Sequence, residues 1–344
     1  MSSIRFGQRR GLTNLFDPPI QITPYNSTVM RKVFLVYNPL SGRRRWRRSK
    51  DIEDVLGFLR AHGIEGSSAP THAAGDASTQ VNEAIAAGCD TIFACGGDGT
   101  IHDVLQSLVG TDTALGVIPL GTANSLAHDL GIPPSPTGAA HAAISARPRR
   151  VAVGRIEYQA LKGERQSRYF MVVVGIGVDA HLFYELNPAA KRHFGMMAYY
   201  VKATRLWLTH KMEHFAVDID DGLRRRRCEV SQLLAVRIQD FGGVLRELAP
   251  GASLEREDLR FVLFHTRRRT AYLRYVLRGL IGVRWKVPGI ELLHGHALTC
   301  CPLAENSKSR IFVEADGELL GTLPAEITVI PNSLNLLMPA TKTI

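Results

Sequence analysis

The chain contains 344 residues, of which 45% are hydrophobic, and carries a formal net charge of +10 at neutral pH. This length suits one large domain or two medium ones, and the apolar stretch at 169–178 falls short of the roughly 18 residues that a membrane-spanning helix needs. The five cysteines form no Cys-x-x-Cys pair, which disfavours a disulfide framework or a zinc site and favours a cytoplasmic compartment.

The first half of the chain alternates between predicted strands and helices. Residues 1–29 carry prolines and polar residues without periodicity and predict a loose extension, whereas the apolar run 33–37 predicts the first buried strand of a domain over 30–148. The further predicted elements are helices through 52–59 and 77–87, a strand over 91–95, a helix through 101–108 and a strand over 115–119. This alternation predicts an open α/β sheet of parallel strands with crossover helices.

Turn-rich loops follow three of these strands, at 38–42, 96–100 and 121–125. In a parallel sheet the carboxyl ends of the strands lie at one edge, and ligands bind there. We therefore expect the three loops to converge on one ligand site.

The middle loop, Gly96-Gly97-Asp98-Gly99-Thr100, carries the strongest chemical signal. Its glycines let an anion approach the main chain, and the amides at the start of the next helix favour that anion, so the pattern predicts phosphate binding. A carboxylate among phosphates needs a cation or a proton-transfer role, and Asp98 therefore indicates magnesium or proton transfer. The same residues also fit an ordinary glycine turn. Thr100 and Asp103 fit a helix-capping pair, and we predict that role for Asp103.

Beyond residue 148 short strand patterns predominate, and we predict a mostly antiparallel β domain over 149–335. The predicted strands cover 151–158, 168–174, 214–219, 229–237, 259–265, 309–314, 326–330 and 334–338. Longer helical patterns occur at about 189–210 and 270–282. Residues 336–344 form a tail that can return to the first domain, and we expect a ligand in the cleft between the domains.

Arginine concentrates in three clusters, at 43–48, 224–227 and 267–269. Together they favour an anionic partner, nucleotide phosphates or an acidic membrane surface, although each alone fits a solvated basic face. No helix-turn-helix, zinc-finger or RNA-binding signature occurs, so nucleic acid is not expected. The segment 272–288 mixes apolar and basic residues, which suits either an interfacial segment on an anionic membrane or a basic helix packed on a sheet.

The late segment Asp316-Gly317-Glu318 follows a strand pattern. Asp316-Gly317 is a common hairpin turn. Glu318, just past that turn, either points into a cleft or has a structural role.

Four motifs, in this order, resemble the diacylglycerol kinase catalytic-domain family, which includes bacterial lipid kinases, sphingosine kinases and ceramide kinases. The motifs are Asn38-Pro39-x-Ser41-Gly42, Gly96-Gly97-Asp98-Gly99-Thr100, Pro119-Leu120-Gly121-Thr122-Ala123-Asn124 and Asp316-Gly317-Glu318. The resemblance covers about residues 30 to 340. It implies an α/β ATP-binding domain, a β-sandwich that presents the lipid, and an active site in the cleft between them.

The implied reaction is transfer of the γ-phosphoryl group of ATP to a lipid alcohol. Diacylglycerol is the expected acceptor, and a sphingoid base or ceramide is the alternative. The implied location is the cytoplasm, with peripheral attachment to the inner face of the membrane.

The resemblance also implies roles for individual residues. Asn38, Ser41 and Gly42 belong to the first nucleotide loop, Gly96 to Thr100 hold the phosphates, and Gly121 and Thr122 complete the pocket. Glu318 acts as the general base toward the lipid hydroxyl, and Asp98 organises the phosphates and Mg²⁺.

Two stretches depart from the family pattern. Asn124-Ser125 stands where many bacterial members have Asn-Asp. Arg256-Glu257-Asp258-Leu259 stands where members carry an Asp-Asp-Gly linked to magnesium, which makes Asp258 the nearest candidate metal ligand.

Other interpretations stay open. NAD kinases and phosphofructokinases have similar Gly-Gly-Asp-Gly loops, although the first loop and the late Asp-Gly-Glu favour a lipid. A protein that binds lipid and nucleotide without turnover is the non-catalytic alternative. No Gly-x4-Gly-Lys-Ser/Thr element or His-Arg-Asp loop occurs, which disfavours P-loop and protein-kinase chemistry.

Overall fold

The computed structural model describes residues 30–42, 45–72, 75–178, 180, 212–220, 225–242, 248–282, 285–303 and 310–339. The predicted extension 1–29 and the predicted helix 189–210 lie outside the described residues. None of the helices in the described ranges combines the length and the apolar character that crossing a bilayer requires.

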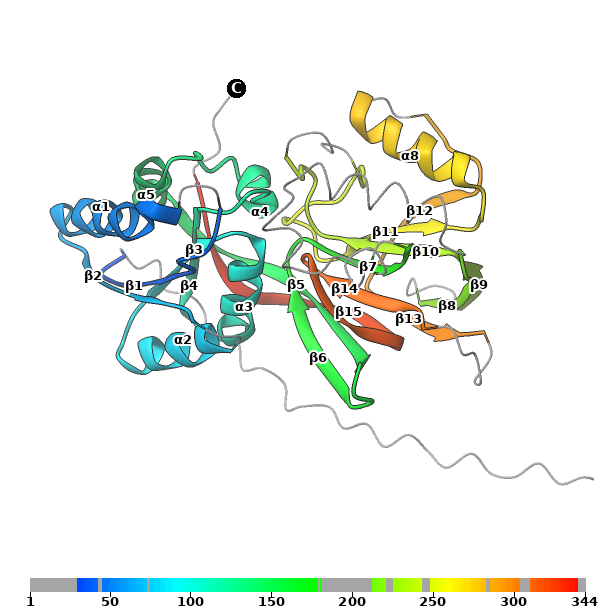
Figure 1. Ribbon diagram of the computed structural model, residues 1–344, viewed down its shortest axis with the longest axis horizontal. Coiled ribbons are helices and arrows are strands. Elements are labelled where there is room, and N and C mark those ends of the chain that lie inside the picture. Colours follow the sequence, from blue (N-terminus) through cyan, green and yellow to red (C-terminus); the bar gives the residue numbers. More distant parts are fainter. Residues whose placement is uncertain are drawn as a thin grey trace, which may run out of the picture.

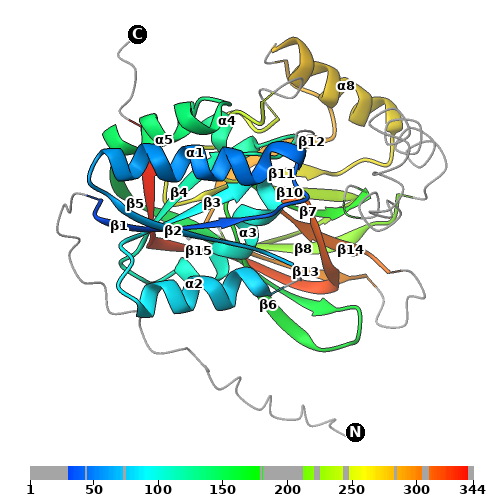
Figure 2. The same ribbon diagram turned by 60° about the vertical axis from the view of Figure 1, so that its left-hand side comes forward.

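An open parallel sheet forms the first half of the molecule, as predicted (Figure 1). Its strands are β1 (Lys32–Tyr37), β2 (Glu65–Pro70), β3 (Thr91–Gly96) and β4 (Ala114–Pro119), and its helical elements are η1 (Arg45–Arg47), α1 (Arg48–Ala61), α2 (Asp76–Ala86), α3 (Asp98–Leu108), α4 (Ser125–Asp129) and α5 (Pro136–Ser145). The strands pair in the order β4-β3-β1-β2, all parallel. Figure 2 shows α1 and α5 on one face of this sheet and α2 on the other.

The hydrophobic pattern explains which elements were predicted. β3 and β4 are buried at every position, so each reads as a continuous apolar run. β2 was not predicted because its sequence EGSSAP has a single apolar side chain besides proline, and it is an edge strand that pairs with β1. The predicted capping role of Asp103 is wrong: α3 begins at Asp98, with Gly97 as its N-cap, so Thr100 and Asp103 both lie inside the helix.

The second half is a β-sandwich of mostly antiparallel strands. Its elements are β5 (Arg147–Ala160), β6 (Arg165–Phe170), β7 (Val173–Gly177), β8 (Phe215–Asp220), β9 (Arg225–Val230), β10 (Gln232–Val236), β11 (Leu259–Phe264), α8 (Arg269–Ile281), β12 (Ile290–Gly295), β13 (Ala297–Pro302), β14 (Phe312–Ala315) and β15 (Glu318–Met338). One layer runs β12-β11-β10-β7-β14-β15, and strands β5, β6, β8, β9 and β13 form the other around β15. The predicted strand 168–174 is divided between β6 and β7, and the two predicted strands at 326–330 and 334–338 are one strand.

β15 joins the two halves. Its first part pairs with β14 in the sandwich, and its last part pairs in parallel with β4, at Asn335 with Ala114 and Leu336 with Leu115. The proposed domain boundary at 148/149 falls inside β5, which pairs with β15 along most of its length. The two halves therefore share one continuous sheet.

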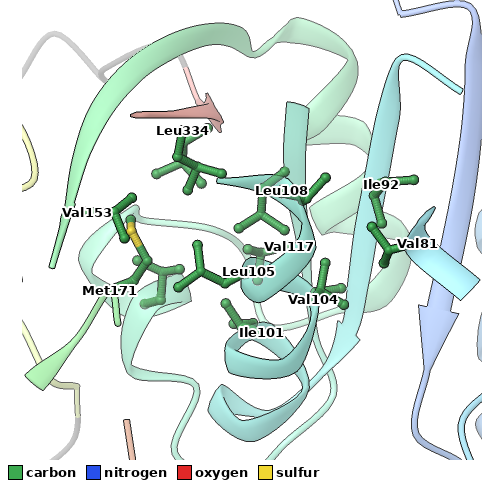
Figure 3. Close-up of a cluster of buried hydrophobic side chains, with 14 of the residues drawn as sticks. Val81, Ile92, Ile101, Val104, Leu105, Leu108, Val117, Val153, Met171 and Leu334 are labelled. Carbon is green, nitrogen blue, oxygen red and sulfur yellow. The ribbon is translucent and has the colours of Figure 1, made fainter. Parts of the chain in front are cut away.

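A single hydrophobic core extends across this junction (Figure 3). Ile101, Leu105 and Leu108 of α3 pack together with Val153 of β5 and with Met171, which precedes β7. Because protein cores are close-packed, such a shared core resists displacement of one half against the other. The junction therefore fixes α3 relative to the sandwich strands beside it.

Candidate active site

The three predicted loops meet at the carboxyl ends of β1, β3 and β4. A Cβ added to Gly97 would lie 3.2 Å from the Cα of Gly121, so the second and third loops touch through their backbones. Gly42 has φ +67, and a Cβ there would overlap the carbonyl of Leu120, so the first and third loops touch as well. Only glycine accepts that conformation and that approach without strain. The predicted convergence of the loops is confirmed.

Arg48 ties the first loop to the third. Its Nη2 donates to the carbonyl of Ser41 at 2.5 Å and to that of Leu120 at 3.1 Å, and the residue is 3% exposed. Burial lowers the pKa of Arg48, while Asp51, 3.6 Å away, acts in the opposite direction. Arg48 therefore has a fixed interior position and does not belong to the basic surface predicted for 43–48.

The side chain of Asn124 holds the third loop closed. Its Oδ1 accepts from the Gly121 amide at 2.9 Å and its Nδ2 donates to the Gly121 carbonyl at 3.2 Å. Asn124 has φ 52, a left-handed conformation that asparagine tolerates better than most residues. Thr122 is exposed in this loop, and Asn38 closes the first loop by accepting the Leu40 amide at 2.8 Å.

Asp98 lies between the second and third loops. Its Oδ1 accepts from the Leu126 amide at 3.4 Å, so the carboxylate stabilises the start of α4. Burial raises the pKa of Asp98; the Leu126 amide opposes this effect, and the nearby Asp316 carboxylate adds to it. Asp98 thus makes a local hydrogen bond, as the ordinary-turn interpretation predicts. Its carboxylate also lies at the N-terminus of α3, the place predicted for phosphate.

Glu318 reaches the same place from the sandwich. It begins β15 directly after a hairpin turn in which Asp316 and Gly317 have φ 50 and 86, positive at both central positions as a type I′ turn requires. A Cβ added to Gly99 would lie 2.9 Å from Glu318 Oε1. The glycine loop and the exposed carboxylate of Glu318 therefore face each other, although 219 positions separate the two residues in the sequence.

Asp316 does more than form the turn. It is 6% exposed, and its carboxylate accepts from the amides of Met171, Val172 and Val173 at 2.9 to 3.0 Å. His102 Nδ1 of α3 lies 3.4 Å from Asp316 Oδ2. This buried contact anchors the hairpin that carries Glu318 to the helix that follows the glycine loop.

Further polar contacts connect the two halves near this point. Gln106 of α3 exchanges two hydrogen bonds of 3.0 Å with the backbone of Tyr169. Asp129 accepts from the amides of Gln239 and Asp240, both at 2.9 Å. The relative position of the loops and the sandwich is therefore set by side chains as well as by the core.

The carboxylates suit a magnesium ion that is also bound by phosphates. Mg²⁺ prefers oxygen ligands and commonly uses one or two protein carboxylates together with substrate phosphates and water. Asp98 supplies one such carboxylate beside the loop, and within the described ranges no group of three or more His, Cys, Asp or Glu side chains could hold a metal alone. The site fits magnesium carried by a phosphate ligand and does not indicate a metal bound by protein alone.

Asp258, the candidate ligand in the sandwich, contacts other residues of the sandwich. Its carboxylate accepts from Arg256 Nε at 2.7 Å and lies 3.2 Å from His294 Nδ1. Although burial acts in the opposite direction, these partners together lower its pKa. The metal role of Asp258 stays a prediction, and the contacts present are those of an ion pair.

Two cavities of the molecule lie away from the loops. Cavities of about 810 and 380 Å³ lie beside the β5–β6 hairpin and strands β13 to β15, and neither is lined by a residue predicted for the site. The location of the site rests on the loop contacts, and not on a cavity.

The sequence analysis does not assign Arg48 or His102 to the site, and it treats Asp316 as a turn residue. Arg48 is one of several adjacent arginines, and nothing in the run distinguishes the buried one. His102 lies four residues after Asp98, a spacing that places both on one side of a helix and could have drawn attention to it.

Glu291 connects the described part of the second basic cluster to the neighbourhood of the third, because it pairs with Arg226 and with His265, two residues before 267–269. Arg43, Arg44 and Arg224 lie outside the described residues, while Arg226 and Arg227 of β9 pair with Glu291 and Asp218. The third cluster, 267–269, is exposed at the start of α8.

Comparisons with known proteins cover both halves. Residues 32–156 match the family model described as the diacylglycerol kinase catalytic domain, and residues 172–338 match the model described as the YegS C-terminal NAD kinase beta sandwich-like domain. The two models together account for nearly all of the described sheet.

Individual relatives match along nearly their whole length. A diacylglycerol kinase of Bacillus subtilis (strain 168) is 28% identical over 316 residues, which cover 91% of this chain and 98% of that protein. A diacylglycerol kinase of Staphylococcus saprophyticus is 24% identical over 311 residues, or 90% of this chain and 96% of that protein. The crystal structure of a diacylglycerol kinase from Bacillus anthracis has a TM-score of 0.69 at 21% identity and covers 92% of this chain and 100% of its own, which shows the shared fold.

Proposed function

The chain belongs to the diacylglycerol kinase catalytic-domain family and is a lipid kinase, and on that premise we propose that it transfers the γ-phosphoryl group of ATP to the free hydroxyl of diacylglycerol. The observation that carries the proposal is the position of Glu318 Oε1, 2.9 Å from where a Gly99 side chain would begin. The loop proposed to bind phosphate and an exposed carboxylate thus face each other, which supports phosphoryl transfer to an alcohol.

The first half of the molecule binds the nucleotide in this proposal. The loops at 38–42, 96–100 and 121–125 present backbone amides, and the N-terminus of α3 favours the phosphate charge. Phosphoryl transfer depends mainly on positioning and on neutralising charge, so a rigid backbone cradle suits it. Mg²⁺, when bound with the phosphates, neutralises their charge, and Asp98 is the residue that would help hold it.

The sandwich supplies the base. Glu318 accepts the proton of the lipid hydroxyl as the oxygen attacks the γ-phosphorus, and the bond from that phosphorus to the β,γ-bridging oxygen breaks to release ADP. General base catalysis contributes about 10²–10⁴-fold to such reactions. The buried contact between Asp316 and His102 keeps the hairpin in place. Glu318 can therefore stay exposed to the substrate without losing its position.

Diacylglycerol is favoured as the acceptor because the curated relatives that cover the chain bear that name. A sphingoid base or ceramide would present the same chemical group to Glu318. Because the acceptor is a membrane lipid, we also propose that the enzyme works on the cytoplasmic face of the membrane as a peripheral protein.

A single assay tests this proposal. The protein is incubated with radiolabelled ATP and Mg²⁺ against mixed micelles of diacylglycerol, sphingosine or ceramide, and against NAD in solution. We expect label in diacylglycerol only, and no label with the Asp98→Ala variant. Label in NAD, or ATP binding without any phosphorylated acceptor, would overturn the proposal in favour of a NAD kinase or of a binding protein.

A further inference from the structure

The helix α8 presents apolar residues on two opposite faces. Its inner face packs on the sandwich: Tyr272 stacks on Phe264 with ring centroids 4.5 Å apart, and its hydroxyl lies 2.7 Å from Ser231 Oγ. Tyr275 is 2% exposed and packs edge-on to Phe264. These contacts attach the helix firmly along one side.

The outer face of α8 is apolar as well. Its exposed large apolar residues are Leu273 (48%), Val276 (40%), Leu277 (39%), Leu280 (39%) and Ile281 (62%). The spacing of three, four, seven and eight residues from Leu273 places all five on one side of a helix. Five of the nine exposed large apolar side chains in the described residues therefore form one continuous stripe, and an exposed patch of this kind marks a binding surface.

Positive charge surrounds this stripe. The segment 266–289 contains seven arginine and lysine residues and no aspartate or glutamate. Arg267, Arg268, Arg274 and Lys286 are exposed. In both views α8 lies at the periphery of the sandwich, near β12 (Figures 1 and 2).

We propose that the outer face of α8 docks the protein on an anionic lipid bilayer, with the apolar stripe entering the boundary between headgroups and acyl chains. The charge complementarity selects this partner: a basic, amphipathic surface helix binds acidic headgroups through its cations and buries its apolar side. At 13 residues the helix is too short to cross the bilayer and lies in its plane. The proposal rests on the proposed function, because a kinase whose acceptor is a bilayer lipid must reach that surface.

For the helical part of 272–288 the structure confirms one of the two predicted interpretations, and the interfacial one stays a proposal. The segment is a basic helix packed on a sheet, through Tyr272 and Tyr275. Among the described residues, the same helix also has a second, exposed apolar side of the kind that an interfacial segment requires.

Matched variants test the docking surface. Leu273→Gln with Ile281→Gln removes two residues of the stripe, and Leu161→Gln with Leu303→Gln changes two leucines of similar exposure, 47% and 48%, away from α8. Binding is measured by sedimentation with vesicles of phosphatidylcholine containing phosphatidylglycerol. We expect the α8 variant to bind about tenfold more weakly and the control variant to bind like the unmodified protein.

A second variant tests the charges. Arg267→Gln, Arg268→Gln and Arg274→Gln together should weaken binding by about fivefold per arginine on anionic vesicles. Binding to vesicles of phosphatidylcholine alone should not change. Raising the salt concentration should reduce this difference, because the Debye length falls to about 3 Å near 1 M.

Activity separates this proposal from the proposed function. A short-chain diacylglycerol that is soluble as a monomer needs no docking, so the Leu273→Gln, Ile281→Gln variant should phosphorylate it at the unmodified rate and lose turnover on vesicles. If the protein docks through α8 but phosphorylates no lipid alcohol in either form, the docking proposal stands and the proposed function fails.

Three results would overturn the docking proposal. The α8 variant could bind vesicles as well as its control does. Trp46 is 83% exposed and lies in the first basic cluster. A Trp46→Ser variant could lose binding while the α8 variant keeps it. Analytical ultracentrifugation could show that the stripe joins two copies of the chain and that vesicles do not bind.

Discussion

The two halves of this molecule contribute different kinds of groups to the site. The parallel sheet contributes mainly backbone, through Gly42, Gly97 and Gly121, whose missing side chains let three loops touch. The sandwich contributes one side chain, Glu318, carried by a hairpin that Asp316 anchors. The backbone loops bind by shape and dipoles, whereas a single carboxylate acts by its chemistry. Mutations in the two halves should therefore affect different properties of the enzyme.

The largest effect is expected from the sandwich side. Glu318→Gln should lower kcat by about 10²–10⁴-fold, because the amide cannot take the proton of the lipid hydroxyl, and should leave the Kd for ATP unchanged. Steady-state kinetics and nucleotide titration measure the two quantities. Glu326→Gln, on the same strand, is the control and should keep full activity; a loss of ATP affinity with normal kcat in Glu318→Gln would show that Glu318 is not the base.

Each half of the molecule also contains a buried arginine, and replacing these two residues should affect stability in both halves. In the sandwich, Arg237 is fully buried and donates to the carbonyls of Ala152, Leu254, Arg256 and Asp258 at 2.7 to 3.2 Å. Burial lowers the pKa of Arg237 to about 10.

Replacing Arg237 with methionine leaves four carbonyl groups without this donor, and each buried acceptor left unsatisfied costs about 1–3 kcal/mol. Arg237→Met should therefore lower the free energy of unfolding by about 3 kcal/mol or more. Urea denaturation measures this, and kcat per folded molecule should be unchanged. Arg256→Met, which removes an exposed partner of Asp258, should have little effect. Equal stability of the two variants would contradict the role given to Arg237.

Arg48 plays the corresponding part in the cradle, with two carbonyl acceptors, those of Ser41 and Leu120. Arg48→Met should lower the free energy of unfolding by about 1–3 kcal/mol. Unlike Arg237→Met, it should also weaken ATP binding, because the first and third loops lose their connection. Isothermal titration with ATP measures the affinity, and an unchanged Kd would mean that Arg48 serves the fold alone.

The smallest expected effect is on the pH dependence of folding stability, to which Asp98 contributes. Burial raises the pKa of this carboxyl in the folded protein, so the folded state holds the proton more tightly than the unfolded state does. By linkage, Asp98 opposes folding more as pH rises from the ordinary aspartate range through this raised pKa, and the penalty is fully present above it.

Asp98→Asn should therefore raise the melting temperature at neutral pH, and the gain should vanish near pH 3, where the carboxyl is protonated in both states. Thermal unfolding across this pH range tests the sign. A gain that stays constant with pH would show that burial of the charge is not the cause. Because asparagine can still accept from the Leu126 amide, the variant leaves the start of α4 intact.

Much of the first half followed from the sequence. β3 and β4 are buried along their whole length, and α3 has one apolar side. Continuous apolar runs therefore locate the strands, and hydrophobic periodicity locates the helix, without any knowledge of their neighbours. β2 escaped because EGSSAP is held at the edge by backbone pairing, which leaves no hydrophobic pattern. In the sandwich, the patterns of single strands predict positions but not partners, and they divide the one long strand β15 into two.

The sequence by itself determined the order of strand, glycine loop and helix, because glycine conformations and hydrophobic periods are local properties. Only the tertiary structure decided that Glu318 faces Gly99, that Asp316 meets His102, and that Arg48 is interior while its neighbours Arg45 and Trp46 are exposed. These facts depend on strand register and on packing between segments far apart in the chain, and neither is encoded in the residues adjacent to a motif.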